Sequence, residues 1–240
     1  MYDIHCHVLS GVDDGAAFPP ESLDMIRMAA DSGTEGIVLT PHCNIPGAYA
    51  NYRTDDLLER FRSLRAAVRE AGIPVRVYTG QEVFCTEDVP ALLEAGKLLT
   101  LNRSRYLLTE FDFCEHPDFV ERMTGRLLSL GLVPIIAHPE RYEFFREDTV
   151  YGRRLKGMGC LLQVNKGSLE GASGPEVQRC AVHLLEAERA DFIASDAHSP
   201  YVRTTPLDGV YEYVSTCFSE GYARRLLSDN PCRVLSDKTL

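Results

Sequence analysis

Short apolar runs rich in β-branched residues alternate along the chain with longer stretches in which apolar residues recur at helical spacing. The short runs predict strands at Tyr2–His7, Gly36–Thr40, Val75–Thr79, Tyr106–Glu110, Val133–Ala137, Leu161–Val164 and Phe192–Ser195. The longer stretches predict helices at Pro20–Ser32, Thr54–Ala71, Asp118–Leu130, Thr149–Met158, Pro175–Glu188 and, after a mixed start, Leu207–Ser228. Asp88–Arg105 is expected to hold a small extra helix and an irregular segment before the fourth strand.

The regular strand–helix order predicts parallel strands joined by right-handed crossovers. Seven such units within 240 residues favour a (β/α)7 barrel over an open sheet. No low-complexity linker, charge block or repeat marks a second domain, so we expect one α/β domain spanning residues 1–240. A barrel carries its functional site at the carboxyl ends of the strands, and candidate chemistry is expected there.

The balance of charge argues against one broad class of function. With 25 basic and 35 acidic residues the chain has a formal net charge of −10, whereas a nucleic-acid-binding face needs a basic surface. No apolar run approaches the ~18–20 residues of a membrane span. The sequence Met1-Tyr2-Asp3 begins no signal peptide. We therefore expect a cytoplasmic protein that binds no nucleic acid and does not insert into a membrane.

The eight cysteines are expected to be reduced and mostly buried, because their spacings include no Cys-x-x-Cys pair and no secretion signal is seen. None is followed by Arg six positions later, so the Cys-x5-Arg loop of cysteine-dependent phosphatases is absent. Cys6 and Cys43 adjoin candidate metal ligands. We expect both to be buried as small hydrophobic side chains rather than to bind metal.

Histidine and carboxylate side chains gather at the ends of the predicted strands. Strand alternation places His5 and His7 on one face, and Asp196 and His198 repeat this spacing far away in the sequence. Each residue alone has an ordinary structural explanation, but the ends of six strands share this restricted set. The candidate ligands are His5, His7, Asp14, His42, Glu82, Glu110, His138, Asp196 and His198.

This set of residues indicates a hydrolytic metal centre. Nitrogen and carboxylate ligands without a thiolate set favour Mn, Fe or Zn. The set exceeds the needs of one ion, which predicts two or three closely spaced ions suited to phosphate-ester hydrolysis. Arg141 and Arg203 follow candidate ligands and are expected to bind phosphate, although each could instead form an exposed salt bridge. Asn44, Asn165 and Lys166 are further candidates to reach the site.

The motifs as a whole resemble those of the polymerase and histidinol phosphatase (PHP) superfamily. They look most like its bacterial protein-tyrosine phosphatases of capsular and exopolysaccharide biosynthesis. Of these motifs, the Val-Asp-Asp-Gly and His-Pro-Glu-Arg-Tyr segments are the ones most specific to these phosphatases. The motifs that carry the resemblance lie at Asp3–His7, Gly11–Gly15, Thr40–His42, Gly80–Glu82, Glu110–Phe111, Ala137–Tyr142, Gln163–Leu169 and Ser195–His198.

The resemblance implies a distorted (β/α)7 barrel and a trinuclear, usually manganese-dependent centre with the nine candidate residues as ligands. It also implies hydrolysis of phosphotyrosine on the tail of a bacterial tyrosine autokinase that controls polysaccharide assembly, and it is compatible with self-association. Arg141 and Arg203 match positions expected to contact phosphate. Two departures are that Cys6 stands where Ser is more usual and that Cys43 follows His42 where the family often has a second His.

The expected mechanism is in-line attack on phosphorus by a metal-bridged hydroxide while Arg141 and Arg203 hold the phosphoryl oxygens. If a general acid is needed, His42 or His198 is the candidate, although a tyrosine leaving group with a pKa of ~10 needs little protonation. Three alternatives stay open. They are a PHP phosphoesterase acting on a small ester such as histidinol phosphate, a non-catalytic metal-stabilised module that binds a kinase tail, and a polymerase-associated exonuclease, which the acidic charge disfavours.

Overall fold

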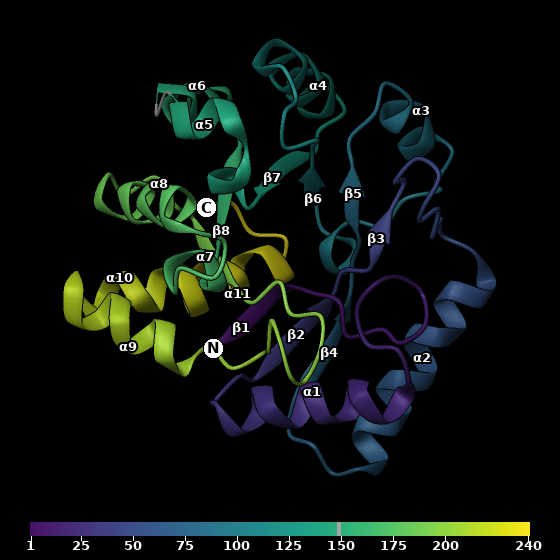
Figure 1. Ribbon diagram of the computed structural model, residues 1–240. Helices are drawn as coiled ribbons and strands as arrows, with labels where there is room; N and C mark the ends of the chain where they lie inside the picture. The colour runs from purple at the N-terminus through teal and green to yellow at the C-terminus, as the bar shows by residue number, and fades with distance from the viewer. Residues whose placement is uncertain (148–149) are drawn as a thin grey trace.

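The computed structural model of the chain describes residues 1–147 and 150–240, with strands at the centre and helices outside them (Figure 1). The strands are β1 (Tyr2–Cys6), β2 (Gly36–Leu39), β3 (His42–Cys43), β4 (Arg76–Thr79), β5 (Glu82–Phe84), β6 (Tyr106–Glu110), β7 (Val133–Ala137), β8 (Leu161–Asn165) and β9 (Phe192–Ala194). The helices are α1 (Pro19–Asp31), α2 (Asp55–Glu70), α3 (Val89–Glu94), α4 (Pro117–Ser129), α5 (Glu143–Glu147), α6 (Val150–Met158), α7 (Lys166–Leu169), α8 (Pro175–Glu186), α9 (Asp208–Cys217), α10 (Glu220–Arg224) and α11 (Asn230–Leu235). Three further helical turns are η1 (Leu101–Arg103), η2 (Pro139–Arg141) and the π-helical η3 (Arg225–Asp229).

The strands form two parallel sheets, one with the order β1-β2-β4 and the other with the order β3-β5-β6-β7-β8-β9. The predicted second and third strands are present as β2 and β4, but each is followed almost at once by a short strand of the other sheet, β3 or β5. The sequence did not predict these two short strands. Pro41 separates β2 from β3, and because proline has no backbone N–H it interrupts the ladder there.

Backbone hydrogen bonds connect the two sheets beside the first strand. His7 N donates to the Ala197 carbonyl at 2.8 Å, Asp196 N donates to the His5 carbonyl at 2.9 Å, and Cys6 and Ala197 form an isolated parallel bridge. β1 therefore lies beside the segment that leaves β9, while β2 and β4 lead directly into β3 and β5. The strands are arranged around one interior, as the prediction of a distorted, TIM-like (β/α)7 barrel requires.

An irregularity in β1 changes the direction of its side chains. Asp3 pairs with Ile37 and Cys6 pairs with Leu39, so β1 uses one more residue than β2 over the same distance. Strict alternation would place Ile4 and Cys6 on the same face. Instead, Ile4 packs in the interior while Cys6 packs in the cluster beneath α1. Such bulges commonly re-aim side chains beside functional sites.

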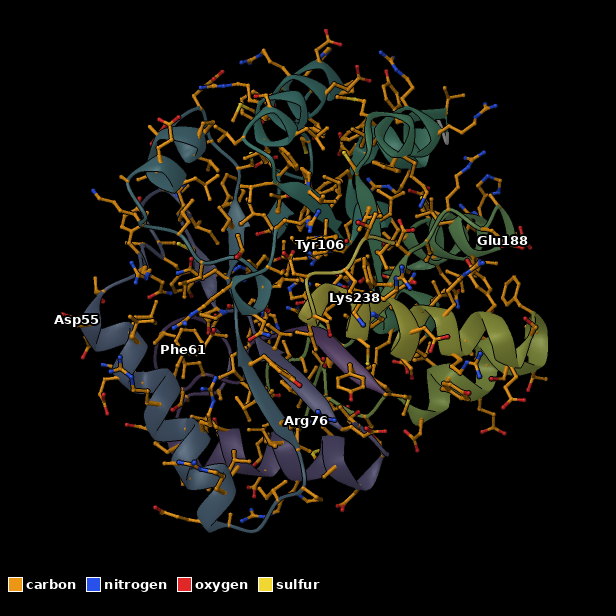
Figure 2. All side chains as sticks on the ribbon, turned by 180° about the vertical axis from the view of Figure 1, so that it is seen from behind. Asp55, Phe61, Arg76, Tyr106, Glu188 and Lys238 are labelled. Atoms are coloured by element: carbon orange, nitrogen blue, oxygen red, sulfur yellow. The ribbon has the colours of Figure 1, made fainter. Side chains whose placement is uncertain are left out.

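Apolar side chains fill the interior toward the amino ends of the strands. This interior apolar cluster consists of Ile4, Val38, Leu101, Tyr106, Leu108, Ile135, Ala137, Phe192, Ala194 and Val234. The carboxyl-terminal segment lies against this end of the interior (Figure 2). A hydrogen bond from the Tyr106 hydroxyl to the Lys238 carbonyl, 2.7 Å long, connects the two. Two further apolar clusters pack the outer helices against the strands.

Most of the predicted helices are confirmed to within two residues at either end, as α1, α2, α4 and α8 show. The helix predicted to begin at Thr149 is present as α6, although Thr149 itself lies outside the described residues. The predicted insertion before the fourth strand contains α3 and η1. Among the helices of the described residues, none has both the length and the apolar character needed to cross a bilayer.

The stretch predicted to be helical at Leu207–Ser228 is helical, but it is divided into α9, α10 and η3. α9 ends at Cys217 because Phe218 leaves the helical conformation, with φ −125° and ψ −80°. A new helix, α10, starts after Ser219, whose hydroxyl caps it by accepting a hydrogen bond from Tyr222 N at 3.1 Å. The chain then continues through η3 into α11. The short helices α5 and α7 were not predicted either.

Candidate metal centre

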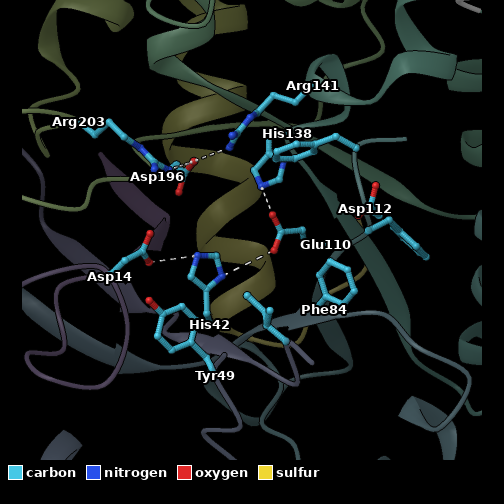
Figure 3. Close-up of a pocket in the computed structure, with 13 residues that line it drawn as sticks. Asp14, His42, Tyr49, Phe84, Glu110, Asp112, His138, Arg141, Asp196 and Arg203 are labelled. Carbon is cyan, nitrogen blue, oxygen red and sulfur yellow. Dashed lines mark hydrogen bonds and ion pairs between the residues drawn. The ribbon is translucent and has the colours of Figure 1, made fainter. Parts of the chain in front are cut away.

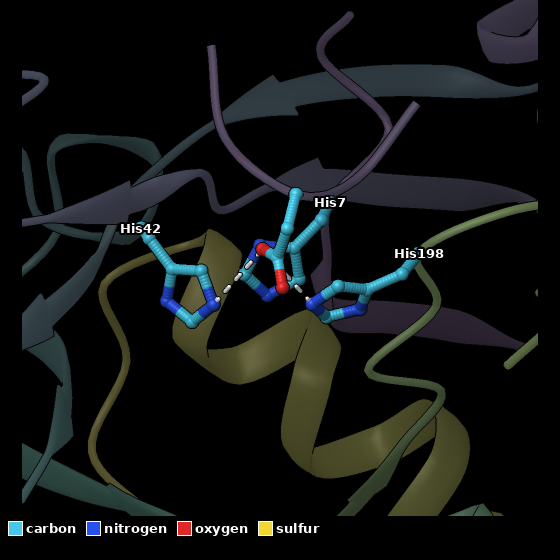
Figure 4. A group of neighbouring side chains, drawn as sticks. His7, His42 and His198 are labelled. Atoms are coloured by element: carbon cyan, nitrogen blue, oxygen red, sulfur yellow. Dashed lines mark ion pairs between the residues drawn. The ribbon is translucent and has the colours of Figure 1, made fainter. Parts of the chain in front are cut away.

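All nine predicted ligands come together at the carboxyl ends of the strands. In each of four groups, one nitrogen or oxygen atom per residue lies within 4.8 Å of the others. Figure 4 shows the rings of His7, His42 and His198 converging in one of these groups. The groups are His7–Asp14–His42–His198, His5–His7–Asp196, His5–Glu82–His138 and His42–Glu82–Glu110. Because the groups share members, they form one continuous cluster.

The first strand and the loop after it build one side of this cluster. His5 and His7 are fully buried, with their Nε2 atoms 3.2 Å apart. The loop folds back onto the strand, since Ala16 N donates to the His7 carbonyl at 3.0 Å. A Cβ atom on Gly15 would lie 2.0 Å from that carbonyl oxygen. Only glycine fits there, and the tight return places Asp14 near the histidines.

Neighbouring side chains fix the tautomers of these two histidines. His5 Nδ1 lies 2.7 Å from Gln163 Oε1, and His7 Nδ1 lies 2.8 Å from Asp13 Oδ2. Both oxygens accept hydrogen bonds, so in the neutral rings each Nδ1 carries the proton and each Nε2 presents a lone pair. Such outer partners orient histidine ligands in metal sites.

The lone pairs of the two histidines point at carboxylate oxygens. His5 Nε2 lies 3.2 Å from Glu82 Oε1 and 3.4 Å from Asp196 Oδ1, and His7 Nε2 lies 3.4 Å from Glu82 Oε2 and from Asp196 Oδ1. Electron pairs that face one another at such distances repel unless positive charge lies among them, either as protons on the rings, whose pKa values the carboxylates raise, or as metal ions. The donor set therefore fits metal ions, which would accept all of these electron pairs.

Several buried polar atoms of the cluster have no hydrogen-bond partner within the described part of the chain. They include Glu82 Oε2, His42 Nδ1, His138 Nδ1 and His198 Nε2. The first two approach to 2.8 Å but without hydrogen-bond geometry. Buried polar atoms are normally paired, so this concentration of unpaired atoms also favours bound metal.

The carboxylates of the cluster differ in their ease of ionisation. Burial opposes ionisation of Glu82, but the charges of His5 and His42 outweigh it and hold the pKa of Glu82 well below its ordinary value. Burial and the negative charges of Glu82 and Asp196 raise the pKa of Glu110 to about 9. The carboxylates are too crowded for all of them to ionise without added positive charge, and divalent cations would provide it.

Asp196 is held by its outer oxygen. Asn165 Nδ2 and Arg203 Nη2 each donate to Asp196 Oδ2 at 2.6 Å, and Arg141 Nη1 lies 3.8 Å from the same atom. Asp196 Oδ1 is left facing His5 and His7. This division of the two oxygens orients the carboxylate toward the cluster.

Three residues at the site have a left-handed backbone that non-glycine residues seldom adopt. The φ angles are 34° at His138, 49° at Asp196 and 53° at Arg203. Such conformations cost free energy and concentrate at functional sites. Surrounding hydrogen bonds stabilise these conformations. At Arg203, for example, the carbonyl accepts a hydrogen bond from His198 N at 2.8 Å.

An open pocket of about 290 Å³ lies over the cluster (Figure 3). Both predicted phosphate-binding residues, Arg141 and Arg203, line it. The Arg141 guanidinium also stacks on Phe113, 4.2 Å from the ring centroid, and Tyr49 lies parallel to His42 on the other side. The pocket therefore combines cations with aromatic walls above the candidate ligands.

The remaining candidates from the sequence lie elsewhere. Asn44 does not line the open pocket. Its side-chain amide donates hydrogen bonds to the Phe84 carbonyl and to Thr86 Oγ1. Asn165 contacts Asp196 and not the open pocket, and Lys166 lines an adjacent pocket. Cys6 and Cys43 are buried, as predicted, and neither belongs to a ligand group.

Sequence reasoning missed the residues that orient the ligands, chiefly Asp13 and Gln163. Gln163 Nε2 donates to Asn165 Oδ1 at 2.8 Å, so these two residues of β8 form a chain from His5 to Asp196. Their spacing of two, Gln-x-Asn, is the signal that could have shown that both face the interior.

Comparison with known proteins agrees with this site. A family model described as capsular polysaccharide synthesis, CpsB/CapC, matches residues 1–236. Tyrosine-protein phosphatase YwqE of Bacillus subtilis (strain 168) is 36% identical over 203 residues, which is 85% of this chain and 79% of YwqE. Tyrosine-protein phosphatase CpsB of Streptococcus pneumoniae is 30% identical over 247 residues, covering 100% of both chains.

Solved structures extend the comparison to the fold. Crystallographic work on YwqE from Bacillus subtilis and CpsB from Streptococcus pneumoniae, described as unique metal-dependent tyrosine phosphatases, provides a chain that superposes with a TM-score of 0.92 at 32% identity. The match covers 100% of this chain and 96% of that one. A Listeria monocytogenes lactonase, Lmo2620, matches with a TM-score of 0.58 at 11% identity and shares the fold alone. The chain therefore belongs to the CpsB/CapC family of capsular polysaccharide synthesis.

Proposed function

We propose that this chain is a metal-dependent protein-tyrosine phosphatase that acts on phosphotyrosine of a bacterial tyrosine autokinase of polysaccharide synthesis. The proposal is carried by the gathering of all nine predicted ligands in one cluster, with Arg141 and Arg203 on the wall of the open pocket above it. Relatives that match the chain over most or all of its length are named tyrosine-protein phosphatases. In this proposal residues 1–240 act as one phosphoesterase domain.

The nine ligand residues fit two or three divalent ions, for which we propose manganese, with zinc or iron as alternatives. When bound, the ions would supply an activated water as the nucleophile and positive charge for the phosphoryl oxygens. No cysteine or serine lines the open pocket among the described residues, so we expect no covalent phosphoenzyme on such a side chain.

The side chains above the cluster account for binding of an aryl phosphate. Arg141 and Arg203 present guanidinium groups that suit phosphoryl oxygens, and the former is held in place by its contact with Phe113. The aromatic walls, which include Tyr49, offer a surface for the substrate ring. A tyrosine leaving group, whose pKa is ~10, needs little help from an acid.

If a general acid assists, we propose His42 in preference to His198. Burial and the charge of His7 lower the pKa of His198 to about 3, so this ring carries no extra proton to donate at neutral pH. His42 borders the open pocket and is partly exposed, within reach of a leaving group.

Membership of the family supports a proposal for the partner and the setting. We propose that the substrate is the phosphotyrosine tail of the autokinase and that the protein works in the cytoplasm, where such a tail would be phosphorylated. Self-association stays a prediction, and sedimentation of the metal-loaded protein would test it.

The decisive experiment is phosphate release from a phosphotyrosine peptide by metal-stripped protein before and after addition of Mn²⁺, Zn²⁺ or Mg²⁺, with a chelator as control. We expect release only with added metal. Preferred turnover of histidinol phosphate over the peptide would favour the small-ester alternative. Tight peptide binding with metal bound, but no release, would favour the non-catalytic alternative.

A further inference from the structure

A second pocket, with a volume of about 390 Å³, adjoins the open pocket and shares part of its wall. Arg141, Asp196 and Arg203 line both. Beyond this shared wall the second pocket is lined by Lys166 and Glu170 and by the loop that carries Tyr201. Figure 3 shows Arg141 and Arg203 reaching toward Asp196 from opposite sides.

Lys166 is a buried cation without a carboxylate partner. Only 5% of the residue is exposed. Its ammonium donates to the Pro206 carbonyl at 2.7 Å and to Thr204 Oγ1 at 3.5 Å, and no carboxylate lies within ion-pair distance among the residues that the structure describes. An ammonium has three N–H donors, so one is left for another acceptor. Buried lysines are normally paired, and this one lines a pocket instead.

The charges around the second pocket favour an anion. Three cations line it, whereas its carboxylates are Asp196, which is already held by Arg203 and Asn165, and Glu170, which is exposed. Lys166 lies deeper than Glu170, and although the charges of Glu170, Asp3 and Asp208 act on its ammonium, none of them forms a direct ion pair with it. A phosphoryl or carboxylate group would complete the contacts of the ammonium.

The rim of this pocket favours a peptide over a small ion. Tyr201 is 80% exposed and Val202 is 71% exposed, and both lie on the loop that carries Arg203 and borders the pocket. Exposed aromatic and aliphatic side chains beside a charged pocket provide a surface for a neighbouring part of the ligand. A small ion bound in the pocket would not cover them.

We propose that the second pocket, built around Lys166, binds a second anionic group of the substrate peptide, either the carboxylate of a neighbouring Asp or Glu or a second phosphoryl group. This inference rests on the proposed function, because the shared arginine wall connects the second pocket to the site where phosphotyrosine is proposed to bind. The enzyme thus selects acidic or multiply phosphorylated tyrosine-containing segments.

The test compares phosphotyrosine peptides that carry Ala, Glu or a second phosphotyrosine at each position from −3 to +3. For the wild-type enzyme loaded with Mn²⁺, we expect kcat/KM to be about tenfold higher for at least one anionic peptide than for its alanine counterpart. The Glu and phosphotyrosine arms distinguish the two sources of the anion. In Lys166→Met this ratio should fall toward one, and in Glu170→Gln it should rise.

The ratio of kcat/KM for two peptides, measured on one preparation, does not depend on the fraction of enzyme that is active. Partial misfolding of Lys166→Met would therefore leave this ratio unchanged. Lys97→Met, which removes an exposed lysine outside both pockets, is the charge-matched control and should keep the wild-type ratio. Equal kcat/KM for all peptides in the wild type, or an unchanged ratio in both pocket variants, would overturn the inference.

Failure of the proposed function would look different. In that case no peptide releases phosphate with any metal, whatever its flanking residues. Binding of fluorescent peptides with a non-hydrolysable phosphonodifluoromethyl-phenylalanine, measured by anisotropy, still reads the second pocket. A preference for the acidic analogue that Lys166→Met abolishes supports the inference without turnover, and its absence contradicts it.

Discussion

Toward the amino ends of the strands the interior contains Leu108 and its apolar neighbours, whereas toward the carboxyl ends the same strands present histidines and carboxylates. Leu108 and Glu110 are two positions apart on β6, so alternation directs both side chains to one face. The apolar end is satisfied by packing alone. The polar end leaves buried nitrogen and oxygen atoms unpaired within the described residues.

The difference between the two ends separates what folds the chain from what makes it work. Apolar contacts form as soon as the strands assemble, and they stabilise the fold regardless of metal. The ligand cluster holds like charges and lone pairs at short distances, so it costs free energy until cations enter. Changes at one end should therefore affect stability, and changes at the other should affect metal content and catalysis.

The largest expected effect is at the polar end. Replacing Asp196 or His138 by Ala should remove metal and lower kcat/KM by about 10³-fold or more, because each contributes to the candidate centre. Metal analysis of the purified variants and phosphotyrosine-peptide turnover measure the two effects. Asp191→Ala, at the opposite end of β9, breaks the ion pair with Lys156 and serves as the control that keeps its metal. Full activity in both ligand variants would contradict the assignment.

The matching change at the apolar end is Leu108→Ala. The side chain is fully buried, so its loss should lower the free energy of unfolding by about 3 kcal/mol and Tm by about 9 °C. Thermal and urea unfolding measure these values. Below the transition, kcat and metal content should stay near wild type. A strong loss of metal with little loss of stability would show that the two ends are not separable.

Arg141→Ala tests the wall of the open pocket. Its effect on catalysis should be smaller than that of removing a metal ligand and larger than that of Leu108→Ala. We expect kcat/KM to fall by about 10²-fold, because a cation that stabilises the phosphoryl oxygens is lost, while metal content is unchanged. Arg62→Ala, which removes an exposed arginine on α2, controls for net charge. Loss of metal in the Arg141 variant would instead mean that its contact with Asp196 has a structural role.

The smallest expected effect concerns Glu140, a buried carboxyl behind the site that accepts a hydrogen bond from Asn165 N at 2.9 Å. Burial raises its pKa to about 7, above its ordinary value of 4.5. The unfolded chain therefore releases this proton at lower pH than the native protein does. Its contribution to stability is complete below about pH 4.5 and is lost as the pH rises through 7, by about 2 kcal/mol between pH 5 and 7.

Urea unfolding at pH 5, 6, 7 and 8 checks this dependence on metal-free protein. In Glu140→Gln the decline should be shallower than in the wild type, because the amide cannot ionise. A decline of the same slope in both proteins would assign the pH dependence to other groups.

The sequence predicted the cluster better than the fold around it. His and carboxylate side chains at strand ends are local features, and parallel strands bring such ends together wherever they lie in the sequence. The splitting of β2 from β3 and of β4 from β5 was not predictable in this way. It depends on which of two sheets each short segment pairs with, and that choice is made by tertiary contacts.

The orienting residues were missed for a related reason. Asp13 and Asp14 are adjacent and chemically alike, yet only the folded loop shows that the first bonds to His7 Nδ1 and the second joins a ligand group. Gln163 has no charge, and although its spacing from Asn165 indicates an interior position, its role as a partner of His5 is evident only in the folded structure. The break after Cys217 likewise follows from one residue leaving the helical conformation.

The left-handed backbone at His138, Asp196 and Arg203 has a consequence for protein engineering. A random library selected for heat resistance alone would be enriched in glycine at these three positions, since glycine adopts positive φ without a steric penalty. Each such gain would remove a ligand or a guanidinium from the site. Thermostable variants chosen without an activity screen should therefore lose catalytic activity. These three positions should be kept unchanged in any such library.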